Sequence, residues 1–286
     1  MPYVLEQLAL PNSRALASVA IARICGVDSV VQSDLLAVEE PLEIRLAFDG
    51  QNGKRVQQAV SITMRTPGHD PELAIGFLYT EGIIDAPRQV ARVTNCGAGN
   101  VACVKLRPGV SVDFSRLERH FYASSSCGVC GKASLEAARV CPRVRCAMGH
   151  PAVESTVIHR LPKTLRAAQD VFERTGGLHA AALFNVDGDL LCLREDVGRH
   201  NALDKLIGVQ FLAERTPLRE CVLMLSGRVS FELVQKAAVA GIPIVAAVGA
   251  PSSLAVRLGR EHGLSILGFV REDHFNIYTG SERIRT

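Results

Sequence analysis

The residues most able to do chemistry are two thiols, Cys127 and Cys130, in a short polar stretch from Ser124 to Gly131. Glycines follow both thiols, so a partner molecule could approach either sulfur closely. A thiol attacks as its thiolate, and its ordinary pKa of about 8.5 must therefore be lowered. Lys132 and the start of a helix predicted over residues 133–139 would favour the thiolate. The pattern predicts that Cys127 attacks or carries sulfur as a persulfide and that Cys130 assists or resolves.

The same spacing also fits half of a zinc site or a redox disulfide pair, and both alternatives stay open. A four-thiolate zinc site needs a second close pair. Cys141 and Cys146 are five residues apart, and Cys96 and Cys103 are seven apart, so neither pair fits well. A thioredoxin-like pair would stand where a strand meets a helix, whereas the serines before Cys127 are typical of a loop.

The chain has nine cysteines, an odd number, and its first ten residues do not resemble an export signal. We therefore expect free thiols and a cytosolic protein rather than a disulfide framework. Outside the central pair the cysteines are predicted to be structural, and the two that fall in predicted strands, Cys192 and Cys221, are expected in the core. The structural set is Cys25, Cys96, Cys103, Cys141, Cys146, Cys192 and Cys221.

The composition, 48% hydrophobic over 286 residues, is enough for a buried core. The longest apolar run, 237–251, is interrupted by two glycines and a proline, so no membrane-spanning segment is expected. The net charge of +3 is spread along the chain, which argues against nucleic acid as a partner. A nucleotide-sized anion fits this charge better than a duplex.

The first half of the chain predicts a small α+β domain over residues 34–120. Alternating residues at 43–46 and 60–64 predict two strands, and 101–106 predicts a third. Between the second and third of these strands, Asp70 is expected to cap a helix that begins at Pro71 and continues through residues 72–81. Residues 1–33 show no strong period and are interpreted as a peripheral extension or a weakly capped helix. Residues 121–150 form the thiol-bearing connecting segment.

The second half, residues 151–286, predicts a larger α/β domain. Residues 178–184 and 190–193 indicate a hairpin, and a helix follows from Arg199. After residue 221 the pattern is strand, helix, strand, helix, strand, and crossovers of this length make the strands parallel. Their carboxyl ends lie at one edge, so loops 226–228, 249–253 and 270–274 should form one rim. Helix N-termini there, with Arg228 and Arg271, suit phosphate.

Two further groups are ambiguous from the sequence. His179, in the stretch Gly176 to Ala181, fits a structural role or a ligand contact equally well. A zinc deaminase would need an acid where Ala181 stands, so that activity is disfavoured. The polar group Arg199, His200 and Asn201, which continues to Asp204 and Lys205, opens a helix and is either a ligand-contacting group or a solvated face.

Several of these motifs, in this order, closely resemble the FdhD/NarQ family, from about residue 35 to the C-terminus. The motifs are Glu39–Leu42, Thr66–Glu72, Cys127–Gly131, Gly176–Ala181, Glu195–Lys205, Ser226–Arg228 and Gly268–Arg271 with Asn276 and Tyr278. The resemblance implies a small N-terminal α+β domain joined to a cytidine-deaminase-like, three-layer α/β sandwich with a mixed sheet, as a homodimer. It gives no role to residues 1–33.

The resemblance further implies a formate dehydrogenase accessory sulfurtransferase. Such a protein accepts sulfur from a cysteine desulfurase and passes it to the molybdenum cofactor, a bis-molybdopterin guanine dinucleotide, before insertion into the formate dehydrogenase catalytic subunit. Cys127 then matches the persulfide-bearing cysteine and Cys130 its partner, and a GDP-like nucleotide would fit the cofactor site. The alternative is a cofactor-binding chaperone that moves no sulfur. The expected cofactor-binding residues are His179, Arg199, His200, Asn201, Ser226, Gly227, Arg228, Phe269, Val270, Arg271, Glu272, Asp273 and His274.

Overall fold

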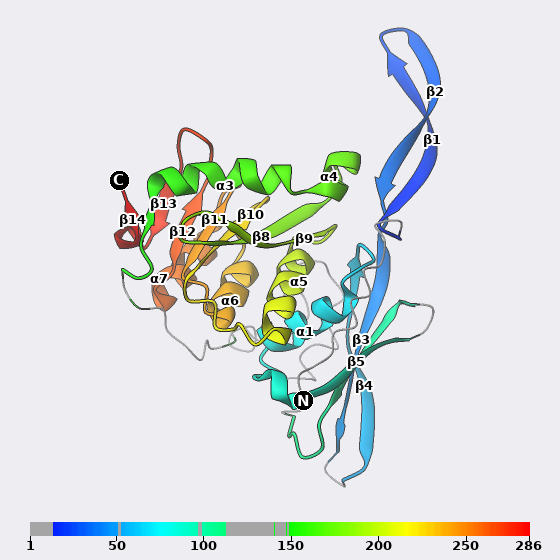
Figure 1. The fold of residues 1–286 in the computed structure, drawn as a ribbon. Helices are drawn as coiled ribbons and strands as arrows, with labels where there is room; N and C mark the ends of the chain where they lie inside the picture. Colours follow the sequence, from blue (N-terminus) through cyan, green and yellow to red (C-terminus); the bar gives the residue numbers. More distant parts are fainter. Residues whose placement is uncertain (1–13, 51–52, 97–98, 113–139, 141–146, 148) are drawn as a thin grey trace.

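The computed structural model describes residues 14–50, 53–96, 99–112, 140, 147 and 149–286 (Figure 1). Its larger part is a six-stranded mixed sheet in the order β13-β12-β11-β10-β8-β9. Figure 1 shows α3 and α4 on one face of this sheet and α5, α6 and α7 on the other. The expected α/β fold with a mixed sheet between helical layers is therefore confirmed, while likeness to cytidine deaminases stays a prediction. The sheet strands are β8 His179–Asn185, β9 Leu190–Asp196, β10 Cys221–Leu225, β11 Ile244–Ala247, β12 Ser265–Gly268 and β13 Asn276–Thr279.

The predicted order of elements after residue 221 is confirmed. Strands β10, β11 and β12 pair in parallel, and β8 pairs antiparallel with both β10 and β9. The strand residues of β10, β11 and β12 are all buried, because helices cover both faces of the sheet. The helices between and before them are α5 Arg199–Leu212, α6 Phe231–Ala240 and α7 Ser253–His262.

A second, four-stranded sheet in the order β4-β3-β6-β5 makes up most of the first part of the chain, and α1 packs against it. The strands predicted at 43–46, 60–64 and 101–106 are confirmed. The predicted capping by Asp70 was wrong: His69 is the N-cap, in the left-handed region, and the Asp70 carboxylate instead pairs with the buried Arg65 guanidinium at 3.0 Å. The elements are β3 Glu40–Asp49, β4 Arg55–Arg65, α1 Asp70–Thr80, η2 Pro87–Gln89, β5 Val90–Cys96 and β6 Val101–Leu106.

The described part of the chain begins with a long hairpin that projects from the body of the molecule (Figure 1). Strands β1 Leu16–Cys25 and β2 Asp28–Ala37 pair along their whole length. The helix considered for residues 1–33 was therefore wrong over the described part of that segment. Most residues of both strands are exposed, so no buried face imposes the polar and apolar alternation by which a strand is recognised.

The two sheets share one hydrophobic core, and α1 crosses α5 at very short range. A Cβ atom on Gly76 would lie 1.9 Å from the Asp204 carbonyl oxygen, and one on Gly208 would lie 1.9 Å from the Glu72 carbonyl oxygen. Only glycine at both positions allows this backbone contact. A buried ion pair lies at the same boundary: Lys236 of α6 pairs with Asp204 of α5 and also donates to the Thr80 hydroxyl of α1, at 2.8–2.9 Å.

Several elements of the structure were not predicted, because their sequences show no recognisable pattern. These are α3 Ser155–Ala167, the short α4 Asp170–Thr175, η4 Ser281–Arg283, and the paired strands β7 Val153–Glu154 and β14 Ile284–Arg285. Helix α3 contains Pro162, which argues against a helix in sequence, yet buries Val157, Ile158, Leu161 and Leu165 against the large sheet. In the part of the chain that the structure describes, no helix is both long and apolar enough to span a bilayer.

Candidate functional site

The three loops after β10, β11 and β12 lie side by side, as the sequence predicted. We call residues 226–228, 249–253 and 269–274 the strand-end rim. The Gly249 amide donates to the Gly227 carbonyl at 3.1 Å, and the Phe269 amide donates to the Gly249 carbonyl at 3.2 Å. A Cβ atom on Gly249 would lie 2.8 Å from the Gly227 carbonyl oxygen, so this close approach requires glycine. The rim leads into the N-termini of α6 and α7, whose amides favour anions.

The start of β8 and the end of β9 also lie at the rim, because β8 runs antiparallel to both β10 and β9. His179 pairs with Asp196 in the β8–β9 register. The Ala180 amide donates to the Ser226 hydroxyl at 2.8 Å, and a Cβ atom on Gly227 would lie 3.2 Å from the His179 Nδ1. Since α5 begins directly after β9, Arg199 joins this group. The fold thus brings His179, Arg199 and the 226–228 loop together.

His179 and Arg199 differ in how their polar atoms are used. Burial, with the nearby Arg199 charge, lowers the pKa of His179, so a neutral imidazole is favoured. The buried Nε of Arg199 has no hydrogen-bond partner. His200 instead contacts the Ser230 hydroxyl at 3.2 Å, at the start of α6. Arg199 therefore has an unused donor beside a half-buried, uncharged histidine.

Asn201 faces inward and holds the two parts of the molecule together. Its amide nitrogen donates to the Met64 carbonyl at 2.7 Å and to Asp196 Oδ1 at 3.1 Å, and its amide oxygen accepts from the Thr63 hydroxyl at 3.2 Å. Asp196 is fully buried and pairs with Lys205 at 2.6 Å. The Asn201 amide is thus occupied by internal bonds that fix the first turn of α5.

The last loop of the rim is held in a defined shape. Phe269 lies in the left-handed region with φ 54°, a conformation that costs a non-glycine residue about 1–2 kcal/mol. The residue is 40% exposed, which leaves an aromatic side chain open to a ligand at the end of β12. Arg271 Nη1 donates to the carbonyls of Val270 and Val248 at 2.8 and 2.9 Å. Val270 itself is buried, so it can offer a ligand its backbone only.

Glu272, Asp273 and His274 of the same loop are exposed. Glu272 lines a cavity, and the Asp273 carboxylate bonds the neighbouring His274 ring at 2.7 Å. That hydrogen bond lowers the pKa of Asp273. The His159 ring of α3 contacts the Arg271 carbonyl oxygen at 3.0 Å and so joins this loop to the opposite helix.

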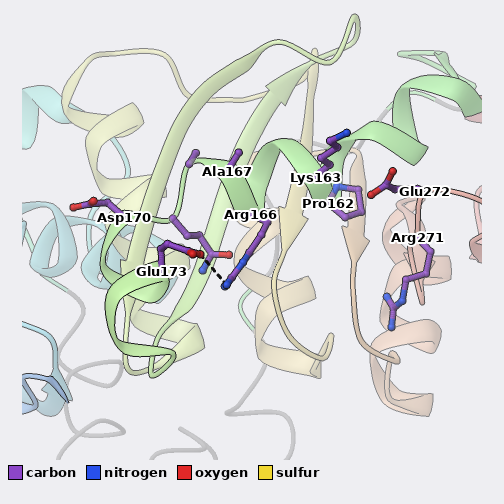
Figure 2. Close-up of a pocket in the computed structure, with 10 residues that line it drawn as sticks. Pro162, Lys163, Arg166, Ala167, Asp170, Glu173, Arg271 and Glu272 are labelled. Atoms are coloured by element: carbon purple, nitrogen blue, oxygen red, sulfur yellow. Dashed lines mark ion pairs between the residues drawn. The ribbon is translucent and has the colours of Figure 1, made fainter. Parts of the chain in front are cut away.

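Two adjoining cavities lie between the rim and the α3–α4 layer. One, of about 510 Å³, is lined by His179, Ser226 and the Gly176–Gly177 backbone; the other, of about 580 Å³, by Arg271 and Glu272. Figure 2 shows Arg166 of α3 between Asp170 and Glu173 on one side and Lys163 and Pro162 on the other. Both cavities are lined by Pro162, Arg166 and Gln169, so we treat them as one and call it the recess.

The α3–α4 side of the recess was not predicted from the sequence. Arg166 lies 4.2 Å above the Phe172 ring and pairs with Glu173 at 2.9 Å. Gln169 is 3% exposed, and its amide nitrogen has no hydrogen-bond partner. Nothing in the local sequence marks these residues, because α3 reaches the rim only through its packing across the sheet.

Cys127 and Cys130 lie outside the described residues, so their position relative to the rim stays a prediction. Among the described cysteines, Cys103 and Cys221 are buried as expected, and Cys192, also expected in the core, is half-buried and packs against it. Cys25 and Cys96 were expected to be structural but are exposed, and Cys141 and Cys146 lie outside the described residues. Burial raises the pKa of Cys221 to about 11. Within the described ranges, no cluster of three or more His, Cys, Asp or Glu side chains could hold a metal ion.

Comparison with known proteins gives the family. The sequence model of the FdhD/NarQ family matches residues 37–285. The chain belongs to the FdhD/NarQ family. It is 49% identical over 272 residues to a protein of Mycolicibacterium paratuberculosis named "Sulfur carrier protein FdhD", covering 92% of this chain and 97% of that protein. A Streptomyces coelicolor protein of the same name is 50% identical over 260 residues, covering 88% of this chain and 89% of that protein.

A solved structure shares the fold of this FdhD/NarQ family member. It is the "Crystal structure of a putative formate dehydrogenase accessory protein from Desulfotalea psychrophila". The TM-score is 0.72 at 22% sequence identity, and the match covers 95% of this chain and 100% of that one. At this identity the likeness shows the fold alone.

Proposed function

We propose that the chain is a sulfur carrier in formate dehydrogenase maturation. In this proposal it accepts sulfur from a cysteine desulfurase and passes it to the molybdenum cofactor, a bis-molybdopterin guanine dinucleotide, before that cofactor enters the dehydrogenase. Family membership supports the carrier role, since two relatives about half identical in sequence are named sulfur carrier proteins. The observation in the structure that favours this reading is the strand-end rim beside the recess.

The rim is suited to a large, polyanionic acceptor such as this cofactor. The N-termini of α6 and α7 are directed at it, and the exposed side chains of Arg228 and Arg271 add positive charge. The exposed ring of Phe269 offers a face for stacking a planar ring. Arg199, with its free Nε, provides a further donor at the same place. These features support binding of phosphates and rings together.

The sulfur steps follow from thiol chemistry. The Cys127 thiolate attacks the outer sulfur of the desulfurase persulfide, whose own cysteine thiolate leaves with the electron pair of the broken sulfur–sulfur bond. Cys127 then carries the persulfide. On delivery, the Cys130 thiolate attacks the Cys127 sulfur, hydrosulfide leaves toward the bound acceptor, and a Cys127–Cys130 disulfide remains. A thiol reductant returns both cysteines to thiols, so atoms and electrons balance.

Sulfur loading tests this proposal directly. The protein is incubated with a cysteine desulfurase and cysteine, and its mass is measured before and after addition of a thiol. We expect a gain of one sulfur atom that the thiol removes. Cys127→Ala should not gain this mass and should not support formate dehydrogenase activity, whereas Cys96→Ala, which removes another exposed thiol, should load normally.

Two results would contradict the carrier role. If the wild-type protein gains no sulfur but still binds a guanine nucleotide, the chaperone alternative is favoured. If Cys127→Ala loads like the wild type, the assigned cysteine is wrong.

A further inference from the structure

Gln169 is an internal residue of the recess, and within the described residues its amide nitrogen makes no hydrogen bond. It is 3% exposed and lines both cavities. In the part of the chain that the structure describes, only two buried side-chain nitrogens lack a hydrogen-bond partner, Gln169 Nε2 and Arg199 Nε. Buried polar groups are nearly always satisfied, so each exception calls for a cause. Burial and the Arg199 charge lower the pKa of His179, which lines the recess, so Arg199 lies near the recess, while Gln169 is part of its lining.

The local structure explains why this amide is free. Gln169 is the N-cap residue of α4, a position from which a side chain ordinarily bonds the first helical amides. Here Glu195 of β9 does so instead, because its two carboxylate oxygens accept from the Val171 and Phe172 amides at 3.1 and 2.9 Å. The Gln169 side chain therefore makes no capping bond. The cap from β9 fixes the α3–α4 turn. The Gln169 amide nitrogen lies near the same Glu195 carboxylate, which its own caps occupy, and makes no full hydrogen bond to it, so this donor can bond a ligand.

The recess has the properties of a site for a planar, uncharged ring. Its cavities of about 510 and 580 Å³ are in the size range of small-molecule sites. The positive charges of Lys163, Arg166 and Arg271 are matched by carboxylates on the same lining, so a phosphate gains little there and would lie at the rim. His179 is held neutral. A ring with an acceptor for the Gln169 amide fits this environment.

We propose that Gln169 recognises the lactam edge, an adjacent C=O and N–H, that guanine and pterin rings share. A primary amide offers an N–H donor beside a carbonyl acceptor, which is the complement of that edge. The inference rests on the proposed function, because the acceptor cofactor there carries guanine and pterin rings. Gln169 is thus the residue that selects the ring, while the rim holds the phosphates.

The test compares Gln169→Leu with the wild-type protein by calorimetric titration with GDP, ADP and 6-hydroxymethylpterin. The wild type should bind GDP, the pterin or both more tightly than ADP. Loss of the hydrogen bonds to the lactam edge should weaken the lactam-bearing ligand by about tenfold or more and leave ADP unchanged. Leucine also removes an unpaired buried donor, so the melting temperature should stay equal or rise. If Gln169 instead only stabilised the fold, Gln169→Leu would lower the melting temperature.

Gln169→Met, which has an unbranched side chain, controls for the case in which leucine packs badly at this position. It should change ligand affinity in the same way as Gln169→Leu. Gln57→Leu, on the exposed part of β4, is the matched control and should bind all three ligands like the wild type. A selective loss of GDP assigns the guanine ring to the recess, and a selective loss of the pterin assigns the pterin ring. Equal binding of ADP and GDP with no pterin binding, or affinities unchanged in both variants, overturns the proposal.

The outcome is separable from that of the proposed function, since sulfur loading of Cys127 is measured without any nucleotide. A wild-type protein that discriminates GDP from ADP through Gln169 but takes up no sulfur contradicts the carrier role alone. A wild-type protein that loads sulfur, while Gln169→Leu binds every ligand normally, contradicts only the role of Gln169.

Discussion

The buried pair Lys205–Asp196 belongs to the second part of the chain, and both of its members bond Thr66 of the first part. The pair should therefore help to hold the two parts together, and replacing Lys205 by methionine tests this. Lys205 Nζ lies 2.6 Å from Asp196 Oδ2 and donates to the Thr66 carbonyl at 2.8 Å. Both side chains are at most 1% exposed, so water cannot solvate the Asp196 carboxylate once the lysine charge is removed. Methionine keeps the length of the side chain and leaves the carboxylate without its cation.

The expected loss in the free energy of unfolding depends on the hydrogen bonds that Asp196 keeps. Removing one partner of a buried pair costs about 3–5 kcal/mol, and Asp196 keeps three donors, the Thr66 and Gly198 amides and the Asn201 side chain. We therefore expect the lower end, about 3 kcal/mol. For a protein of this size that is a fall in melting temperature of about 6–12 °C.

Calorimetry and urea unfolding measure this loss, with Lys105→Met on an exposed part of β6 as the matched control. The control should change stability by less than about 0.5 kcal/mol. In the double variant, Asp196→Asn with Lys205→Met, no buried charge remains, so it should be more stable than Lys205→Met alone by about 1 kcal/mol or more. A loss below about 1 kcal/mol, or a double variant no better than the single, would refute the reasoning.

Two further predictions concern ionisation. Burial raises the pKa of Cys221 to about 11, so at pH 8 iodoacetamide should alkylate the exposed Cys96 at least tenfold faster, as peptide mass spectrometry would measure; equal rates would contradict the burial. Burial alone would raise the pKa of Glu72, but bonds from His69 and Arg194 outweigh it and lower the pKa below the ordinary 4.5. This stabilisation is complete above pH 4.5 and lost as the pH falls through the lowered value, so Glu72→Gln should flatten the acid limb of a stability–pH curve.

The sequence predicted those parts of the fold whose pattern is imposed by burial on a regular element. The runs at 222–225 and 244–247 are buried on both faces, so they are continuously apolar and recognisable as parallel strands. From parallel strands the meeting of loops 226–228, 249–253 and 270–274 follows by geometry alone. The hairpin at 16–37 lacks a buried face along most of its length, so its sequence lacks the alternation of polar and apolar residues that would have predicted two strands.

The candidate site was predicted on one side only. His179, Ser226 and Arg271 were found because they stand at strand ends or in motifs. Arg166, Gln169 and Phe172 were missed, since they come from a helix with an internal proline and from a helical segment of six residues. Asn201 was predicted to contact the cofactor, whereas its amide is occupied by Met64, Asp196 and Thr63. A local pattern shows that a polar residue is present but not which way it faces.

By itself the sequence determined the class of fold, the family and the pair of thiols, because these depend on residue type and on spacing along one strand or motif. Only the tertiary structure decided which side of the sheet the recess occupies and that Glu195 caps α4 in place of Gln169. Such contacts join residues 23 or more positions apart, and their energy depends on burial and on competition among donors. Neither quantity can be read from neighbouring residues, which is why Gln169 is visible only once the chain is folded.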